Sequence, residues 1–266
     1  MAINTADRLL GVGGYAVRAL VYLMLIMPAA IVIGSSFTAG EILQFPPAGV
    51  SGRWYVEAYN NAAFRASLLL SLQLAAMVTS CSLVVGFCAA FALDRYSFRG
   101  REAFRALLLS PLVIPAVIMG LALLQFLVWT KLNRTILGLL IGHVIVTLPY
   151  VVRTLSAGMT LFDRNVEQAA MSLRASPLRV LRTIILPLLR PTILSAVVFA
   201  FVTSFGNVTL SVFLGFGEYV TLPVQIFSYV EHNYDPLIAA VSSVVIVITV
   251  TTIVLVERIS GVGIAK

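Results

Sequence analysis

Six long runs of mainly apolar residues limit what this chain of 266 residues can fold into. An α-helix needs about 20 such residues to cross the roughly 30 Å hydrocarbon core of a bilayer. Only 11% of the residues are charged and 60% are hydrophobic, whereas a soluble domain has about 25% charged residues. The chain is therefore predicted to be an all-α, polytopic membrane protein. The six predicted spans are residues 15–37, 66–93, 106–129, 136–152, 191–214 and 237–256.

The first apolar run exceeds the roughly 7–15 residues of a secretory signal, so it is predicted to be a retained helix. No internal repeat or low-complexity segment interrupts the chain. We therefore expect a single membrane domain over residues 1–266.

Lysine and arginine are distributed unevenly between the loops. If the N-terminus lies inside the cell, 14 of the 18 basic residues fall on the inner side. Ten of these lie in two loops, four in residues 94–105 and six in residues 153–190. Because cytoplasmic loops concentrate basic residues, both termini are predicted to be cytoplasmic. The net charge of +7 then reflects topology and gives no reason to expect nucleic-acid binding.

The chain carries no visible energy source of its own. A phosphate-binding loop needs Gly-Lys-Ser/Thr, and neither Lys131 nor Lys266 follows a glycine. Ion-driven carriers usually place ionisable groups at membrane depth. Only His143 lies deep in a predicted span, either as a hydrogen-bonded packing residue or as a transport group. Energy is therefore expected from a partner protein.

Two other classes stay open at this point. A stand-alone channel or secondary carrier would move solute down a gradient without any ATPase. An intramembrane enzyme would need a nucleophile and a base in one site, and the sequence has neither a Gly-x-Ser-x-Gly elbow nor a metal-ligand cluster. No catalytic residue and no metal site is therefore predicted.

The polar stretch 153–190 is predicted to be a cytoplasmic loop containing two short helices. Asp163 is a suitable N-cap for the first helix. Ser176 followed by Pro177 is typical of the start of the second, as an N-cap with proline at the first helical position. Apolar residues recur at helical spacing in both. Such a segment either lies in the membrane interface or docks on a protein.

This loop resembles the EAA loop of bacterial ABC importer permeases, which is written Glu-Ala-Ala, three residues, Gly, nine residues, Ile-x-Leu-Pro. Two positions depart from the motif, since Gln168 replaces its glutamate and Arg174 replaces its glycine. The resemblance implies that this loop couples the permease to an ATPase. The residues carried over are Glu167, Gln168, Ala169, Ala170, Leu173, Arg174, Ile184, Leu186 and Pro187.

Other segments are similar to the spermidine/putrescine branch of that family. They include Phe45–Tyr55, Phe98–Arg101, Pro111–Pro115 and Ser204–Ser211. The resemblance implies a type I ABC importer permease for polyamines. Relatives in this branch carry ferric iron, opines, phosphonates or amino acid derivatives, so these solutes stay as alternatives.

The resemblance also implies an assembly in the bacterial inner membrane. A second homologous permease subunit, two copies of a cytoplasmic ABC ATPase and an extracytoplasmic solute-binding protein are the expected partners. The chain itself would bind no cofactor, and ATP and Mg would be used by the ATPases.

Polar residues in the third to fifth predicted spans are candidates for the translocation path, with helix–helix hydrogen bonding as the alternative role. These are Gln125, Thr147, Ser204, Asn207, Thr209 and Ser211. The candidate outer gate is Thr221, Leu222 and Pro223.

Overall fold

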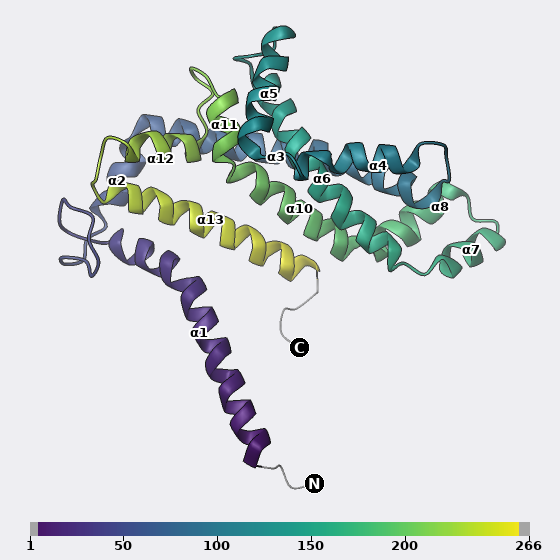
Figure 1. Ribbon diagram of the computed structural model, residues 1–266, viewed down its shortest axis with the longest axis horizontal. Coiled ribbons are helices and arrows are strands. Elements are labelled where there is room, and N and C mark those ends of the chain that lie inside the picture. Colours follow the sequence, from purple (N-terminus) through teal and green to yellow (C-terminus); the bar gives the residue numbers. More distant parts are fainter. Residues whose placement is uncertain (1–4, 261–266) are drawn as a thin grey trace. The chain divides into compact units, whose positions relative to one another are not determined.

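The computed structural model describes residues 5–260, most of which lie in helices (Figure 1). Over these residues it has one isolated antiparallel bridge, between Thr38 and Val50, and no strand. The all-α prediction is confirmed. The long helices are α1 (Thr5–Ser35), α3 (Ala62–Arg95), α5 (Ala116–Trp129), α6 (Ile136–Thr160), α10 (Arg190–Phe205) and α13 (Leu237–Ser260). The shorter elements are α2 (Arg53–Asn60), α4 (Arg101–Leu109), η1 (Ser110–Leu112), α7 (Arg164–Ser172), α8 (Pro177–Val180), η2 (Leu181–Ile185), α9 (Leu186–Leu188), α11 (Val208–Leu214) and α12 (Leu222–Val230).

The chain divides into two compact units. Unit 1 comprises residues 1–65 and 228–248, and unit 2 comprises residues 66–227 and 249–266. Both α3 and α13 run from one unit into the other. The single membrane domain expected over residues 1–266 stays a prediction, because compact packing units within one chain need not be separate domains.

Within the described residues, four helices are long and apolar enough to cross a membrane, or six if each of two bent helix pairs counts as one span. The four are Val17–Ser35, Ala62–Arg95, Ile136–Thr160 and Leu237–Ile259. Three of these helices extend beyond the predicted spans 66–93, 136–152 and 237–256. Helix α1 begins before residue 15 and ends at Ser35, so residues 36 and 37 of the first predicted span are not helical.

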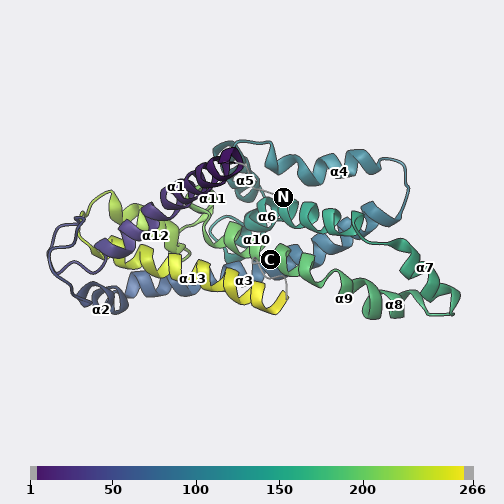
Figure 2. The same cartoon turned by 90° about the horizontal axis from the view of Figure 1, so that it is seen from below.

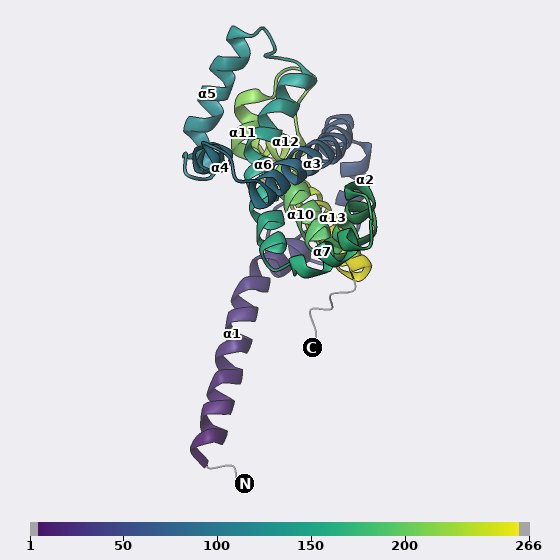
Figure 3. The same cartoon turned by 90° about the vertical axis from the view of Figure 1, so that its right-hand side faces the viewer.

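The third predicted span, 106–129, is not one continuous helix. It is broken between η1 and α5, where the chain bends by 106° (Figure 3). Pro115 has no N–H to give to a helix and disfavours helical geometry in the residue before it. Pro115 instead stands at the N-cap of α5, with an extended ψ of 133°.

The fifth predicted span, 191–214, is also broken. Helix α10 ends at Phe205, and α11 begins at Val208. Asn207 lies between them in an extended conformation, and its side chain accepts a hydrogen bond from the Leu210 N–H. The asparagine thus caps α11, and a new helix start replaces the continuous span.

The predicted loop 153–190 is shorter than expected. Helix α6 continues to Thr160, so residues 153–160 are helical. The segments α8, η2 and α9 follow one another as a helical rod over Pro177–Leu188 (Figure 2). This rod meets α10 at a bend of 69° beside Leu189. Pro187 and Pro191 flank the bend. A proline inside a helix removes a backbone hydrogen bond, which favours a bend at this point.

The core of unit 2 contains two main clusters. One joins the C-terminal half of α3 to α6, α10 and the Pro177–Leu188 rod, and its buried members include Val151, Leu155 and Ala196. The other joins α3, α5, α6 and α11 around Leu74, Leu139 and Leu210. Helix α6 contributes to both clusters and packs along α10. The rod and α6 therefore share one packed core.

Unit 1 is held together by contacts from α2 to the segment after α1. The indole N–H of Trp54 donates to the Thr38 carbonyl at 3.1 Å, and the hydroxyls of Ser36 and Tyr55 lie 2.6 Å apart. Trp54 is buried, whereas Tyr59 is exposed. Of the aromatic residues around α2, Trp54 and Tyr55 therefore take part in the packing of this unit.

Candidate functional site

Both helix starts predicted in the stretch 153–190 are confirmed. The Asp163 side chain accepts a hydrogen bond from the Asn165 N–H at 2.9 Å and caps α7. The Ser176 hydroxyl accepts from the Arg179 N–H at 3.4 Å, with Pro177 at the first position of α8. Each cap satisfies an N–H group that a helix start leaves without a partner.

The turn between α7 and α8 has a left-handed residue at the position where the EAA motif has glycine. Arg174 has φ of 62° there. Its N–H donates to the Met171 carbonyl, and the Ala175 N–H donates to the Ala170 carbonyl at 3.1 Å. This is the Schellman pattern, in which glycine is preferred. The chain keeps the turn with arginine, at a backbone cost of about 1–2 kcal/mol.

Helix α7 has an inner and an outer side. Ala170 packs against the core cluster of α6, α10 and the rod. Ala169 is exposed, and so are Val166 and Leu173, at 44% and 85%. We call Val166, Ala169 and Leu173 the coupling surface. It is a small apolar surface on a polar helix, which is a feature typical of helix-in-groove recognition.

The remaining motif residues divide in the same way. Ile184 is half-buried and packs against the core cluster, and Leu186 is half-buried as well. Gln168 and Pro187 are exposed. Ile184 thus anchors the rod to the core of unit 2, whereas Gln168 is exposed where the motif has a glutamate.

The inner side of α7 is joined to the end of α3 by four charged residues. Arg95 Nη2 lies 2.6 Å from Glu167 Oε2, and Arg164 Nη2 lies 3.1 Å from Asp94 Oδ2. Asp94 also contacts Arg95, at 3.6 Å. We call Asp94, Arg95, Arg164 and Glu167 the charge clasp. Arg164 and Glu167 are three residues apart and therefore share one face of α7.

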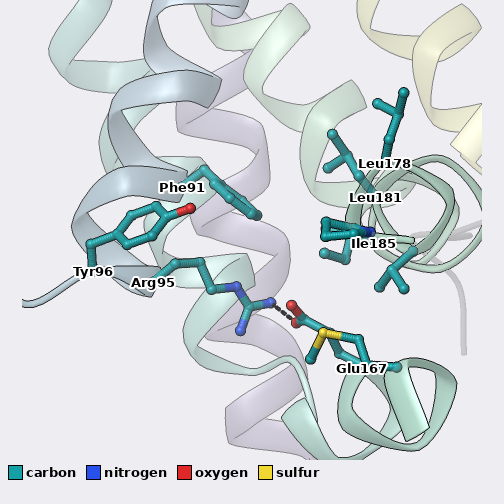
Figure 4. A pocket seen from close by; sticks show the side chains of 10 residues that line it. Phe91, Arg95, Tyr96, Glu167, Leu178, Leu181 and Ile185 are labelled. Atoms are coloured by element: carbon teal, nitrogen blue, oxygen red, sulfur yellow. Dashed lines mark ion pairs between the residues drawn. The ribbon is translucent and has the colours of Figure 1, made fainter. Parts of the chain in front are cut away.

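A cavity of about 460 Å³ lies beside the Arg95–Glu167 pair (Figure 4). Figure 4 shows the two side chains meeting on one side of it, with Leu178, Leu181 and Ile185 of the rod across the space. The arginine also lies over two aromatic rings, Phe91 at 5.6 Å and Phe162 at 5.5 Å. Cation–π attraction from both rings adds to the ion pair.

A second polar cluster surrounds His143, deep in α6. The imidazole Nδ1 lies 3.1 Å from the Ser204 hydroxyl of α10, and Nε2 lies 3.1 Å from the Ser211 hydroxyl of α11. All three side chains are buried, His143 at 1% exposure. His143 thus links the two helices on either side of the break at Gly206 and Asn207. Ser204 and Ser211 take part in helix–helix hydrogen bonding.

The hydrogen bonds assign the tautomer of this imidazole. The Ser211 hydroxyl donates its single proton to the Asn207 carbonyl at 2.6 Å. It must therefore accept from His143, so Nε2 carries the proton. In the neutral ring Nδ1 then accepts from the Ser204 hydroxyl. The hydrogen bonds thus run from Ser204 to His143, from His143 to Ser211, and from Ser211 to the Asn207 carbonyl at the helix break.

A His143→Ala substitution is expected to destabilise the protein in detergent. It removes two hydrogen bonds, each worth about 0.6 kcal/mol in membrane proteins, and leaves a cavity. His143→Asn places an amide near the Nδ1 position and should retain part of the Ser204 contact. The unfolding temperature of the purified protein should be highest for the wild type, lower for His143→Asn and lowest for His143→Ala. Equal unfolding temperatures for all three would show that the cluster is dispensable.

A further cavity of about 270 Å³ lies where both broken spans meet α6. Its polar lining comes from Tyr150, Thr203 and Asn207, and its apolar lining from the turn around Pro111 and Ile114. Of the predicted path residues, Asn207 therefore faces a cavity. Thr147 is buried within α6, Thr209 is half-buried on α11, and Gln125 is exposed on α5.

The candidate gate lies at the start of α12. The Leu222 N–H donates to the Ser71 hydroxyl of α3 at 2.7 Å, and Leu222 is buried at this point. Thr221 is buried beside it, and Pro223 is half-buried. These residues fix α12 to a long span.

Sequence reasoning missed the partners of the motif residues. From the sequence, Asp94 and Arg95 are only charges in a basic stretch, and nothing distinguishes Tyr150 or Thr203 from other residues of the spans. The alternating charges Asp94-Arg95 and Arg164…Glu167 were the available signal, but a sequence does not show which segments meet. Within residues 5–260, no three His, Cys, Asp or Glu side chains are close enough to hold a metal ion.

Comparison with known proteins agrees with this architecture. The family described as binding-protein-dependent transport system inner membrane component matches residues 82–260. The chain is 32% identical over 241 residues to the spermidine/putrescine transport system permease protein PotC of Haemophilus influenzae, covering 90% of this chain and 93% of that one. It is 32% identical over 233 residues to the putrescine transport system permease protein PotI of Escherichia coli, covering 85% and 82%.

A solved structure of a bacterial ABC transporter for import of the acidic polysaccharide alginate shares the fold, with a TM-score of 0.68 at 15% identity, covering 97% of this chain and 98% of that one. The matched family covers more than half of the chain, and the relatives match along most of their length. The chain belongs to the family of binding-protein-dependent transport system inner membrane components, and is a membrane permease subunit of an ABC importer.

Proposed function

We propose that this permease imports polyamines, such as spermidine or putrescine. Two relatives named for these solutes align with most of the chain, and the family match places it among importers that depend on a binding protein. A polyamine is an extended cation that an aromatic face and polar oxygens would accommodate. The cavity lined by Tyr150, Thr203 and Asn207 offers these groups.

The coupling surface carries the proposal for how energy enters. Val166, Ala169 and Leu173 are exposed on a capped helix whose other side is anchored to unit 2. An apolar surface that stays exposed in its own unit is suited to a groove on another protein. We assign that groove to a cytoplasmic ATPase, of which two copies with ATP and Mg would serve a pair of permease subunits. The second subunit would be a homologous chain.

The proposed orientation places both termini in the cytoplasm. The charge clasp joins the two most basic stretches, residues 94–105 and 153–190, which together carry ten arginines. On one side of the membrane these arginines would have the distribution typical of a cytoplasmic face. The coupling surface then faces the compartment that contains ATP.

Transport would proceed by alternating access around the broken helices. Closure of the ATPases would displace α7, and the rod and α6 would move with it because they share one packed core. Broken spans surround substrate sites in many transporters, since their free helix ends line the path. The breaks at Pro115 and Asn207 both border the Tyr150 cavity.

Uptake into proteoliposomes tests the proposal. The chain, its paired permease, the ATPase and the binding protein would be reconstituted with ATP inside, and radiolabelled spermidine supplied outside with the binding protein. We expect accumulation that requires ATP and the binding protein, and that excess putrescine reduces by more than about half.

A matched competitor separates the solute from the machinery. Excess phosphonate should leave spermidine uptake unchanged. ATP-dependent uptake of phosphonate with none of spermidine would overturn the polyamine assignment and leave the importer assignment standing. Movement of solute through the purified chain alone, without ATPase, would support a channel or carrier.

A further inference from the structure

We propose that Arg95 is a positioning residue for energy coupling, which makes α3 the span that receives the motion of α7 through the charge clasp. This inference rests on the proposed function, in which an ATPase moves α7. It adds a defined connection from that helix to a membrane span on the far side of the cavity from the rod. Neither Asp94 nor Arg95 belongs to the EAA-type motif.

The ion pair adds a polar link to an apolar one. Helix α3 and the rod already share the core cluster that contains Ala90, Val180 and Ile185. Beside the cavity, Arg95 reaches Glu167 from the α3 side (Figure 4). The Arg95–Glu167 contact at 2.6 Å is the shortest of the five ion pairs found in the described residues. Removing one charge breaks this contact, whereas the apolar packing around Ala90 holds without it, so a charge variant tests the ion pair alone.

Burial makes this pair stronger than an ordinary surface ion pair. The side chains of Arg95 and Glu167 are only 11% and 16% exposed. Charges shielded from water attract each other more strongly, and removing one partner leaves the other unpaired at a high cost. The rings of Phe91 and Phe162 fix the guanidinium in place, so that a shift of Glu167 is passed to α3.

The second pair of the clasp restricts rotation of α7. Arg164 Nη2 contacts both the Asp94 side chain, at 3.1 Å, and the Asp94 carbonyl, at 2.9 Å. With Glu167 held one turn further along, α7 is attached at two points to the last residues of α3. With two attachment points, a rotation of α7 is passed to α3 as well as a displacement. A single point would pass on the displacement alone.

The test compares solute moved per ATP hydrolysed in the reconstituted importer. Arg95→Glu and Glu167→Arg should each lower this ratio about fivefold or more, with ATP hydrolysis stimulated by the loaded binding protein largely retained. The double variant Arg95→Glu/Glu167→Arg should recover at least about half of the wild-type ratio. Glu167→Gln, which keeps the shape of the side chain, should give an intermediate value and provides a second reading if a reversal variant does not fold.

The matched control is Arg105→Glu, which reverses one charge of the exposed Arg105–Glu102 pair on α4. It should leave the ratio unchanged. A parallel fall of uptake and hydrolysis in the Arg95 and Glu167 variants, with the ratio unchanged, would mean a merely structural role and overturn the inference. A double variant with a ratio of solute to ATP no higher than that of the single variants would also overturn it. Failure of the wild-type chain to import with ATP would overturn the proposed function itself, a result that these variants do not imitate.

Discussion

Ala169→Asp is expected to abolish most ATP-driven uptake while the protein still accumulates in the membrane at the wild-type level. Ala169 is exposed on α7, so the carboxylate meets water in the isolated chain and costs little more than the helix propensity difference of about 0.7 kcal/mol. In a docked complex the same charge would be buried without a partner. Such a charge costs about 2–5 kcal/mol, enough to weaken ATPase binding about 30-fold or more.

Co-purification of the ATPase with the tagged permease and uptake into proteoliposomes would both measure this effect. Ala103→Asp is the matched control, because Ala103 is exposed on the short helix α4. It should bind the ATPase and import as wild type does. Ala170→Asp is a poorer probe, since Ala170 packs on the core of unit 2 and its loss would disturb folding as well. Normal ATPase binding by Ala169→Asp would remove the coupling surface from the proposed mechanism.

Gly158→Ala is expected to destabilise the packing of α6 against α10. A Cβ at this position would lie 2.5 Å from two atoms of the Thr192 side chain and 2.9 Å from its Cβ. Because the Thr192 Cβ is fixed by the backbone, the two helices must move apart. Overpacking of this kind costs about 1–3 kcal/mol, which outweighs the gain of about 0.5–1 kcal/mol from alanine in a helix.

Thermal unfolding in detergent would show the change as a lower melting temperature. Gly14→Ala in α1 is the control of opposite sign, since no atom lies within 4 Å of a Cβ there and only the gain in helix propensity remains. Adding Thr192→Ala to Gly158→Ala should recover part of the loss by removing two of the clashing atoms. An unchanged melting temperature in Gly158→Ala would mean that the α6–α10 crossing tolerates more separation than the geometry indicates.

The two helix breaks depend on packing that the sequence does not show. Pro115 was visible in the sequence, yet a proline within an apolar run is compatible with either a kinked span or a broken one. The bend of 106° depends on what α5 packs against, which is the α6 and α11 surface around Leu139 and Leu210. Asn207 is a similar case, because an asparagine in a span can either pack against another helix or cap a new helix. The break at Gly206 makes Asn207 the N-cap of α11.

The sequence by itself determined the features that depend on local chemistry. Long apolar runs required helices, Asp163 and Ser176 started α7 and α8, and the spacing from Ala169 to Pro187 matched the EAA-type motif. The tertiary structure alone decided which side of α7 is free. Ala169 and Ala170 are chemically identical neighbours, and only packing makes one exposed and the other part of the core.

The same holds for the charges. Arg95 and Glu167 are 72 positions apart in the sequence, and either could have faced water. Attraction between two side chains depends on their separation in space and on the dielectric around them, neither of which a linear pattern contains. The fold brings them within 2.6 Å beside a largely apolar cavity, and thereby joins α7 to the long helix α3.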